Sequence, residues 1–233
     1  MEKKKERISV PSYTLSEELI NSISHGIVAA FSIWGLVMLI IKASKVGAMA
    51  VTTVTLFGTT MILLYTISCI YHALSPRITG KKVMRVIDHC NVFLLVFGTI
   101  IPIALVGMKG VYGWVYFGIV GFVTLLGIIF SAIDVDKNEK IEVVCHLVNG
   151  WSAVFFIKPL IAGVGKTGLL LIILGGIMYS IGAFLYAIGS KKKYMHSVFH
   201  FFCILGTIFH YFAIYFFHKI YKFFLINQNN LRR

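Results

Sequence analysis

The chain has 233 residues, of which 58% are hydrophobic and only 13% are charged, and its mean hydropathy is +0.86. Soluble domains average about one-quarter charged residues, so this composition excludes an ordinary soluble domain. The net charge of +13 does not require a nucleic-acid partner, and we expect none, because lysine and arginine cluster in short segments between apolar runs. Several of these runs approach or exceed the roughly 20 residues that a helix needs to cross a bilayer. The sequence therefore predicts an all-α integral membrane protein.

The N-terminal segment is basic and then polar, and it lacks the short apolar core and small-residue cleavage site of a secretory signal. We expect residues 1–16 to form a cytoplasmic tail. Thr14 and Glu17 have the spacing of a capping box, which predicts that a helix begins near Leu15.

Seven apolar runs follow this start. The expected spans are residues 20–42, 48–74, 83–106, 111–133, 141–161, 169–189 and 196–217, the last of which can extend to 225. Residues 75–82 and 134–140 read as polar loops, and residues 226–233 as a loose tail. No segment is long enough for a separate domain, so we predict one seven-transmembrane helix bundle over residues 1–233.

The distribution of cations between the loops predicts the orientation. With the N-terminus inside, the inner segments hold 13 lysine and arginine side chains, whereas the outer loops hold 5 and the C-terminal tail holds 4. The positive-inside rule therefore favours a cytoplasmic N-terminus and an external C-terminus. The expected location is the cell membrane, as a multi-pass protein.

Histidines gather at the expected cytoplasmic level of this bundle. Six of the eight fall at or near the inner ends of five spans: His25, His72, His89, His146, His196 and His200. Glu17 and Asn21 precede His25 at spacings of four, on one helical face. A polar face at the membrane interface explains that spacing as well as a functional role does. The four cysteines have no CxxC spacing and read as buried thiols.

Three of these histidines are the predicted zinc ligands. His196 and His200 are four residues apart and therefore share a helical face, and His72 ends the second span at the same depth. Histidine in an apolar membrane helix calls for a partner, and imidazole is a common zinc ligand. Three imidazoles with an open fourth position are typical of a catalytic zinc site. The alternative is that they are interfacial polar residues without a metal.

Two further polar residues are candidates for catalytic roles beside that site. Asp88 lies in the first turns of the third span and can orient an imidazole or a water, or act as general base. Ser68 lies one turn before His72, where its hydroxyl can hydrogen-bond the water.

These residues resemble the hemolysin III branch of the progestin and adipoQ receptor family. The resemblance rests on the run Ser68-Cys69-Ile70-Tyr71-His72, on Asp88, and on the run from His196 to His200, and residues 17–26 look like the branch's first-span signature. It covers residues 17–218 and implies a seven-helix bundle with a cytoplasmic-side zinc held by three histidines. The wider group includes alkaline ceramidases, which implies metal-dependent hydrolysis of lipid amides.

Three functions remain open at this point. The first is a zinc-dependent hydrolase of a lipid amide or ester, with a membrane lipid as its substrate. The second, which the branch name implies, is a pore-forming cytolytic protein, although the outer halves of the spans are nearly free of the charge that a pore should show. The third is a membrane regulator that zinc stabilises without catalysis. The sequence does not indicate an oligomeric state.

Overall fold

The structure is a computed structural model that describes residues 8–108, 110–189 and 192–216. These residues form helices and short connections, with no strand among them. The α-helices are α1 (Leu15–Ala43), α2 (Ala48–Ala73), α3 (Thr79–Pro102), α4 (Gly110–Ile133), α5 (Val135–Trp151), α6 (Ile157–Gly189) and α7 (Met195–Tyr215). A π-helical turn, Ile103–Met108, follows Pro102, and a 3₁₀ turn, Ser152–Phe156, joins α5 to α6.

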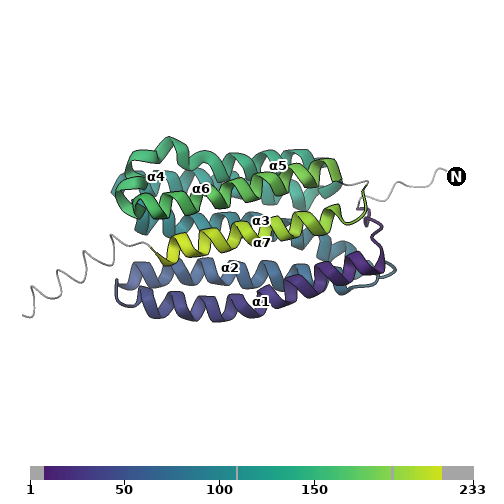
Figure 1. The fold of residues 1–233 in the computed structure, drawn as a ribbon. Helices are drawn as coiled ribbons and strands as arrows, with labels where there is room; N and C mark the ends of the chain where they lie inside the picture. The colour runs from purple at the N-terminus through teal and green to yellow at the C-terminus, as the bar shows by residue number, and fades with distance from the viewer. Residues whose placement is uncertain (1–7, 109, 190–191, 217–233) are drawn as a thin grey trace, which may run out of the picture.

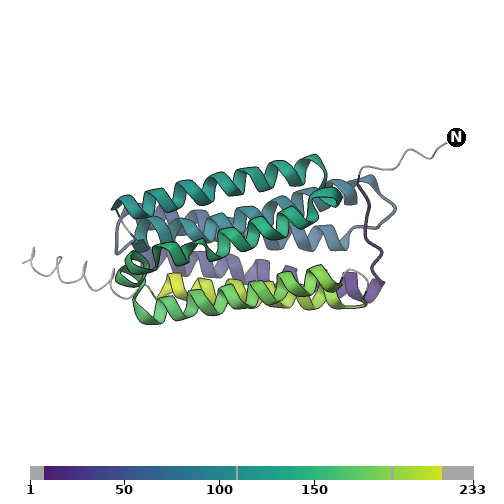
Figure 2. The same cartoon turned by 90° about the horizontal axis from the view of Figure 1, so that it is seen from above.

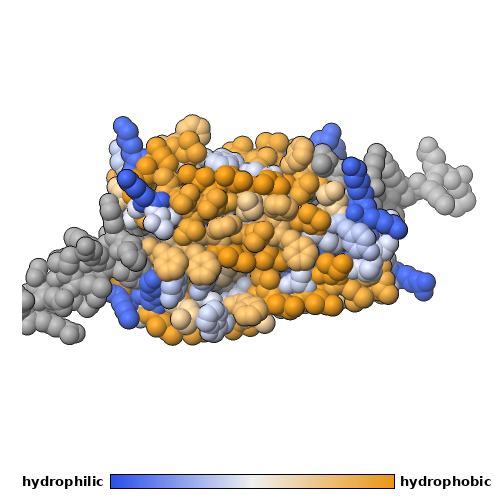
Figure 3. Space-filling model, viewed as in Figure 1, coloured by the Kyte–Doolittle hydropathy of each residue, from blue (hydrophilic) through white to orange (hydrophobic). Residues whose placement is uncertain are grey.

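The helices lie side by side along one long axis (Figures 1 and 2). In Figure 1, α1 and α2 form one side of the bundle, α3 and α7 run through its middle, and α4, α5 and α6 form the other side. Hydrophobic residues cover the middle of the face shown in Figure 3, and hydrophilic residues gather at both ends. Large apolar side chains such as Phe155 (88% exposed) and Val111 (76%) face outward, as a lipid-facing surface requires.

The predicted start of α1 is confirmed. Thr14 is the N-cap, and its hydroxyl accepts a hydrogen bond from the Glu17 backbone N–H (3.4 Å). In return, the Glu17 carboxylate accepts from the Thr14 backbone N–H (2.8 Å). This reciprocal pair satisfies two of the donors that a helix N-terminus leaves free, so the helix begins at Leu15.

The predicted loop at residues 134–140 is wrong, because α5 already begins at Val135. The Asp134 side chain caps it by accepting a hydrogen bond from the Lys137 backbone N–H (3.0 Å). Charged residues therefore form the first turns of a helix here rather than a solvated turn. The loop before α3 is also shorter than expected, since α3 begins at Thr79.

Six segments of the described chain are long and apolar enough to cross a membrane. The fifth of them, Val135–Ala187, has 53 residues and contains Gly165, whose φ of 74° and ψ of 178° are not helical. Beyond this residue the chain turns back, since Trp151 Nε1 donates a hydrogen bond to Ser180 Oγ (2.9 Å). The structure therefore confirms an all-helical membrane protein, and the number of crossings and their orientation remain predictions.

Two glycines allow the first turns of α6 to contact the π-helical turn closely. A Cβ added at Gly163 would lie 1.6 Å from the carbonyl oxygen of Gly107, so only glycine fits this approach. The contact joins α6 to the π-helical turn after α3, at the end of the bundle opposite the N-terminus (Figure 1).

Candidate metal centre

Three histidines meet at the end of the bundle from which the chain enters, in agreement with the sequence prediction. His72 lies in the last turn of α2, and His196 and His200 lie in the first turns of α7. One ring nitrogen from each lies within 4.8 Å of the other two. His72 and His200 are buried and His196 is partly buried. Two segments far apart in sequence therefore supply one cluster, which we call the histidine trio.

The ring of His72 is fixed by a carboxylate. His72 Nδ1 lies 2.7 Å from Glu18 Oε2, while the other oxygen of Glu18 accepts from Lys81 Nζ. Lys81 also donates to the carbonyl of Leu74 (2.8 Å), so all three side chains are locked in a buried network. A carboxylate can only accept, so His72 donates from Nδ1 and keeps the lone pair on Nε2. Among the described residues, this buried Nε2 has no hydrogen-bond partner.

The ring of His200 is held on both sides by other histidines. Its Nδ1 lies 2.8 Å from His25 Nε2, and its Nε2 lies 2.8 Å from His196 Nε2. If His200 donates from Nδ1 to His25, its Nε2 lone pair faces the trio. His25 therefore contacts the outer nitrogen of His200 as Glu18 contacts that of His72, and such a partner can fix the tautomer of the ring.

This donor set fits a metal ion. Three imidazoles converge, two of them have their outer nitrogens held, and the Nε2 of His72 is buried without a partner within the described part of the chain. A histidine that binds a metal usually donates its second N–H to a carboxylate or another acceptor, as His72 does. Within the described residues the cluster contains three histidines and no fourth metal-ligating side chain, and three protein ligands are the number typical of an open zinc site, whereas closed structural sites use four.

Ser68 and Asp88, the two predicted catalytic residues, both line a cavity beside the trio. Ser68 is 1% exposed and Asp88 is partly buried. Ser68 comes from α2 and Asp88 from α3. Ser68 Oγ and Asp88 Oδ1 are both inaccessible and have no partner in the described structure.

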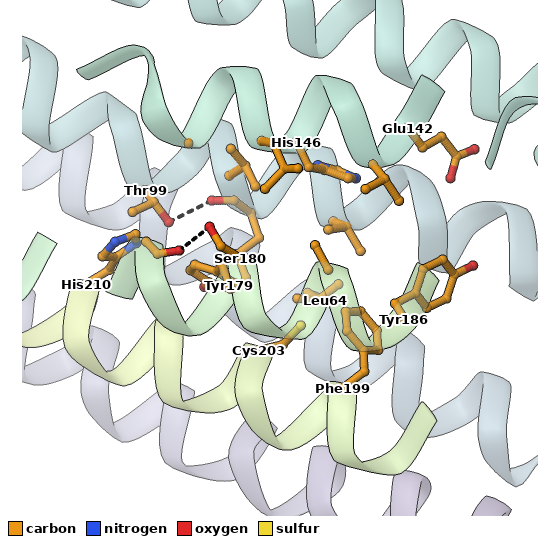
Figure 4. Close-up of a pocket in the computed structure, with 18 of the residues that line it drawn as sticks. Leu64, Thr99, Glu142, His146, Tyr179, Ser180, Tyr186, Phe199, Cys203 and His210 are labelled. Atoms are coloured by element: carbon orange, nitrogen blue, oxygen red, sulfur yellow. Dashed lines mark hydrogen bonds between the residues drawn. The ribbon is translucent and has the colours of Figure 1, made fainter. Parts of the chain in front are cut away.

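The cavity has a volume of about 170 Å³ and runs from the trio into the bundle between α3, α5, α6 and α7 (Figure 4). At the trio end its walls carry His196, His200 and Asp88. The rest of its surface is mostly apolar and includes Leu95, Ile100, Ile103 and Phe199. The lining of the cavity is therefore polar at the trio end and apolar along the rest of its length.

The other predicted histidines lie elsewhere in the bundle. His146 lines the same cavity but stacks on Phe93 (3.8 Å between ring centres) rather than joining the trio. His89 pairs with Glu142 of α5. His210 lies deeper in α7, where its ring N–H donates to the carbonyl of Ile172 (3.1 Å). His218 is outside the described residues.

The N-terminal strap, residues 8–14, covers this end of the bundle. The Tyr13 ring stacks on the His196 ring, with 4.8 Å between ring centres and 19° between planes. Ser9 fastens the strap, because its backbone carbonyl accepts from Arg85 (2.9 Å) and its N–H donates to Asp136 (2.7 Å). Burial raises the pKa of Tyr13, which therefore stays neutral. Part of the expected tail is thus packed against the trio.

Sequence reasoning missed Glu18 and Lys81. Glu17 drew attention because it caps α1 and begins the spacing of four, but its neighbour makes the contact to His72. Lys81 was counted as a loop charge, whereas it is 0% exposed. The sequence does offer a signal for this pair. Glu18 lies at the start of one expected span and Lys81 just before another, at the same membrane level, where opposite charges tend to pair.

Fold and site together define a multi-pass helical membrane protein with a cluster of three histidines at one end. Comparison with known proteins supplies the family. The profile of the family described as Haemolysin-III related matches residues 13–211. The chain is 34% identical to Hemolysin-3 of Bacillus cereus over 214 residues, which cover 91% of this chain and 96% of that protein.

A second relative gives the same result. The chain is 35% identical over 206 residues to the Hemolysin-3 homolog of Bacillus subtilis (strain 168), covering 88% of this chain and 96% of the relative. The protein belongs to the hemolysin III family and is a multi-pass protein of the cell membrane. The resemblance seen in the sequence is thereby confirmed at the level of the family.

Proposed function

We propose that this protein is a zinc-dependent hydrolase that acts on a lipid amide or ester within the membrane. The observation that carries the proposal is the histidine trio, in which the unpartnered Nε2 of His72 converges with His196 and His200. A buried ring nitrogen without a hydrogen-bond partner costs folding free energy unless it binds another group. A zinc ion held there would lower the pKa of a bound water to about 7 and polarise a substrate carbonyl.

The chain's own residues supply the other requirements of hydrolysis. Asp88 lies at the polar end of the cavity, where its carboxylate can orient the attacking water and accept its proton. Ser68 lines the same cavity, and its hydroxyl can donate a hydrogen bond. The apolar walls of the cavity suit the chain of a lipid and exclude bulk water from the reacting carbonyl.

A lipid hydrolysis screen tests the proposal. The purified protein, reconstituted in lipid nanodiscs, is incubated with a panel of lipid amides and esters before and after treatment with a chelator. We expect at least one of them to be cleaved, with activity abolished by the chelator and restored by zinc. A zinc-loaded protein inactive on the whole panel would count against the enzyme.

Two other functions have a specific observation in their favour. The curated relatives are named hemolysins, and a lytic protein should release dye from liposomes at a rate that does not depend on Asp88. Zinc that merely ties α2 to α7 fits the locked Glu18–His72 pair, and it predicts zinc-dependent stability with no turnover.

Glu18→Gln is expected to weaken zinc binding by about 10- to 100-fold, the usual effect of losing a carboxylate behind a ligating histidine. The amide cannot provide the charge that holds His72 Nδ1–H and Lys81 together. Competition with a fluorescent chelator measures the affinity. Glu139→Gln, on α5 and outside the cavity lining, is the control and should bind zinc as the wild type does. Equal affinities for the two variants would remove Glu18 from the site.

We propose that the chain crosses the membrane seven times, with its N-terminus in the cytoplasm. The reversal at Gly165 divides the 53-residue segment into two passes, and the loop charges give the direction. Single cysteines at positions 9 and 229, the second beyond the described residues, test both points after the four native cysteines are replaced. An impermeant thiol reagent applied to intact cells should label only position 229. Labelling of position 9 alone would reverse the orientation, and equal behaviour of the two would contradict an odd number of crossings.

A further inference from the structure

A second polar cluster lies in the same cavity, on the side formed by α3 and α5. His89 Nδ1 is 2.7 Å from Glu142 Oε2, and Glu142 is only 4% exposed. His146 follows Glu142 by one helical turn, and both line the cavity with His89 and Asp88. Figure 4 shows Glu142 and His146 on one helix, with Tyr186 and Phe199 on the opposite side of the cavity.

Three atoms of this cluster have no hydrogen-bond partner among the residues described: Glu142 Oε1, Asp88 Oδ1 and His146 Nδ1. All three are inaccessible. Leaving a buried polar atom unsatisfied is costly, and the cost is higher for a carboxylate, so several such atoms around one cavity indicate a binding partner. Two of them are carboxyl oxygens, which accept hydrogen bonds when ionised. The complementary group is therefore a hydrogen-bond donor.

The cavity next to this cluster is apolar. Val92, Val96 and Leu147 lie along it, together with Leu95 and Ile100. A ligand that satisfies both regions needs a donor at one end and a hydrocarbon chain at the other. A second metal ion fits less well, because the only convergent set of metal-ligating atoms in the described residues is the histidine trio.

We propose that Glu142, with His89 and His146 beside it and Asp88 lining the same cavity, binds the hydroxyl or amine group of a lipid whose chain occupies the apolar part of the cavity. This inference rests on the proposed function for the identity of that lipid as the substrate. Glu142 then sets specificity. It attracts lipids with an amine or a hydroxyl beside the scissile bond, and its own carboxylate repels lipids with a free carboxylate. His89 positions Glu142 by donating from Nδ1 to Oε2.

Direct binding tests this inference without any turnover. The zinc-free protein is mixed with equal amounts of dodecylamine, dodecanol and dodecanoate, three probes with one chain and different end groups, and bound copies are counted by native mass spectrometry. We expect the amine and the alcohol to bind and the carboxylate to bind at least about tenfold more weakly, because a hydrogen bond to a charged group is worth about one order of magnitude in affinity. Equal binding of all three probes would overturn the proposal.

Glu142→Gln is the decisive variant. It should lower binding of the amine about tenfold or more and leave binding of dodecanoate unchanged or improved, since it removes the charge and keeps the shape. Glu139→Gln, one turn earlier on α5 and outside the cavity lining, should bind all three probes like the wild type. An unchanged preference in Glu142→Gln would overturn the proposal. A divalent cation that binds His196→Ala/His200→Ala, and no longer binds once Glu142→Gln is added, would also overturn it.

Misfolding of the variant is excluded by a second measurement. Circular dichroism and the zinc content of Glu142→Gln should match the wild type, because Glu142 is not part of the trio. His89→Gln gives an independent test, since it should weaken the same preference by removing the imidazole that positions the Glu142 carboxylate. If the preference for donors depends on Glu142 and yet no lipid is cleaved, the hydrolase fails and the binding site stands. If lipids are cleaved without regard to Glu142, the binding site fails and the hydrolase stands.

Discussion

The double variant His196→Ala/His200→Ala is expected to lose essentially all of its zinc, from about one ion per chain in the wild type. Two of the three imidazoles disappear, and the single histidine left, His72, cannot hold the ion alone. The change also removes the 2.8 Å contact between His200 and His25. His25 Nε2 then loses its partner, and His25 Nδ1 has none among the described residues already. Inductively coupled plasma mass spectrometry of protein purified with and without added zinc measures the content.

His210→Ala is the matched control. It removes an imidazole from the same helix, and that imidazole also lines the cavity, but it bonds the carbonyl of Ile172 and takes no part in the trio. Its zinc content should equal that of the wild type. Full zinc occupancy in the double variant would mean that the zinc binds elsewhere in the protein.

Asp88→Asn is expected to keep the fold and the zinc but to lose hydrolysis of a lipid amide or ester by about 100-fold or more, the usual contribution of a general base. Asparagine preserves the shape of the side chain, and it cannot accept the proton of the attacking water. Asp88 is not one of the convergent metal-ligating residues, so its loss should affect turnover more than it affects zinc affinity. The measurement is the rate of cleavage of a lipid that the screen has identified, alongside zinc content.

Two outcomes bear on this prediction differently. Wild-type hydrolysis by Asp88→Asn would remove Asp88 from the mechanism. A change only in thermal stability, with no hydrolysis in the wild type, would favour a zinc ion that stabilises the bundle. Glu139→Gln again serves as the control, because it makes the same carboxylate-to-amide change outside the cavity lining and should keep full activity.

Much of the fold followed from local signals in the sequence. The Thr14 and Glu17 pair located the first residue of α1 because a capping box is a short-range pattern. The convergence of His72 with His196 and His200 followed from longer-range reasoning: loop charges placed both segments at one membrane level, and membrane thickness fixed their depth. Those constraints hold for any helical bundle, so they carried over to the structure.

The unpredicted features depend on packing between helices. Glu17 and Glu18 differ by about 100° around α1, and nothing in the sequence says which of them faces α2. The rotation of α1 in the bundle decides this, and it places Glu18 against His72. The same rotation brings His25 to His200, a contact between residues 175 positions apart.

Residues 135–140 and His146 illustrate a second limit. Charged residues followed Asp134, and composition alone favoured a loop, whereas the cap and the ion pair between Arg85 and Asp136 (2.5 Å) stabilise a helix there. His146 lines the cavity, but its ring stacks on Phe93 and does not join the trio, and hydropathy gives no information on that direction. Depth comes from hydropathy, while direction around a helix axis comes from tertiary contacts.

A zinc-edge X-ray absorption spectrum of the purified wild-type protein tests the central claim most directly. It reports the atoms bound to the metal without a substrate and without a mutation. The histidine trio predicts about one zinc per chain with three imidazole nitrogens at about 2.0–2.1 Å and one further light ligand. A spectrum dominated by sulfur at about 2.3 Å, or a protein that takes up no zinc after reconstitution, would contradict it.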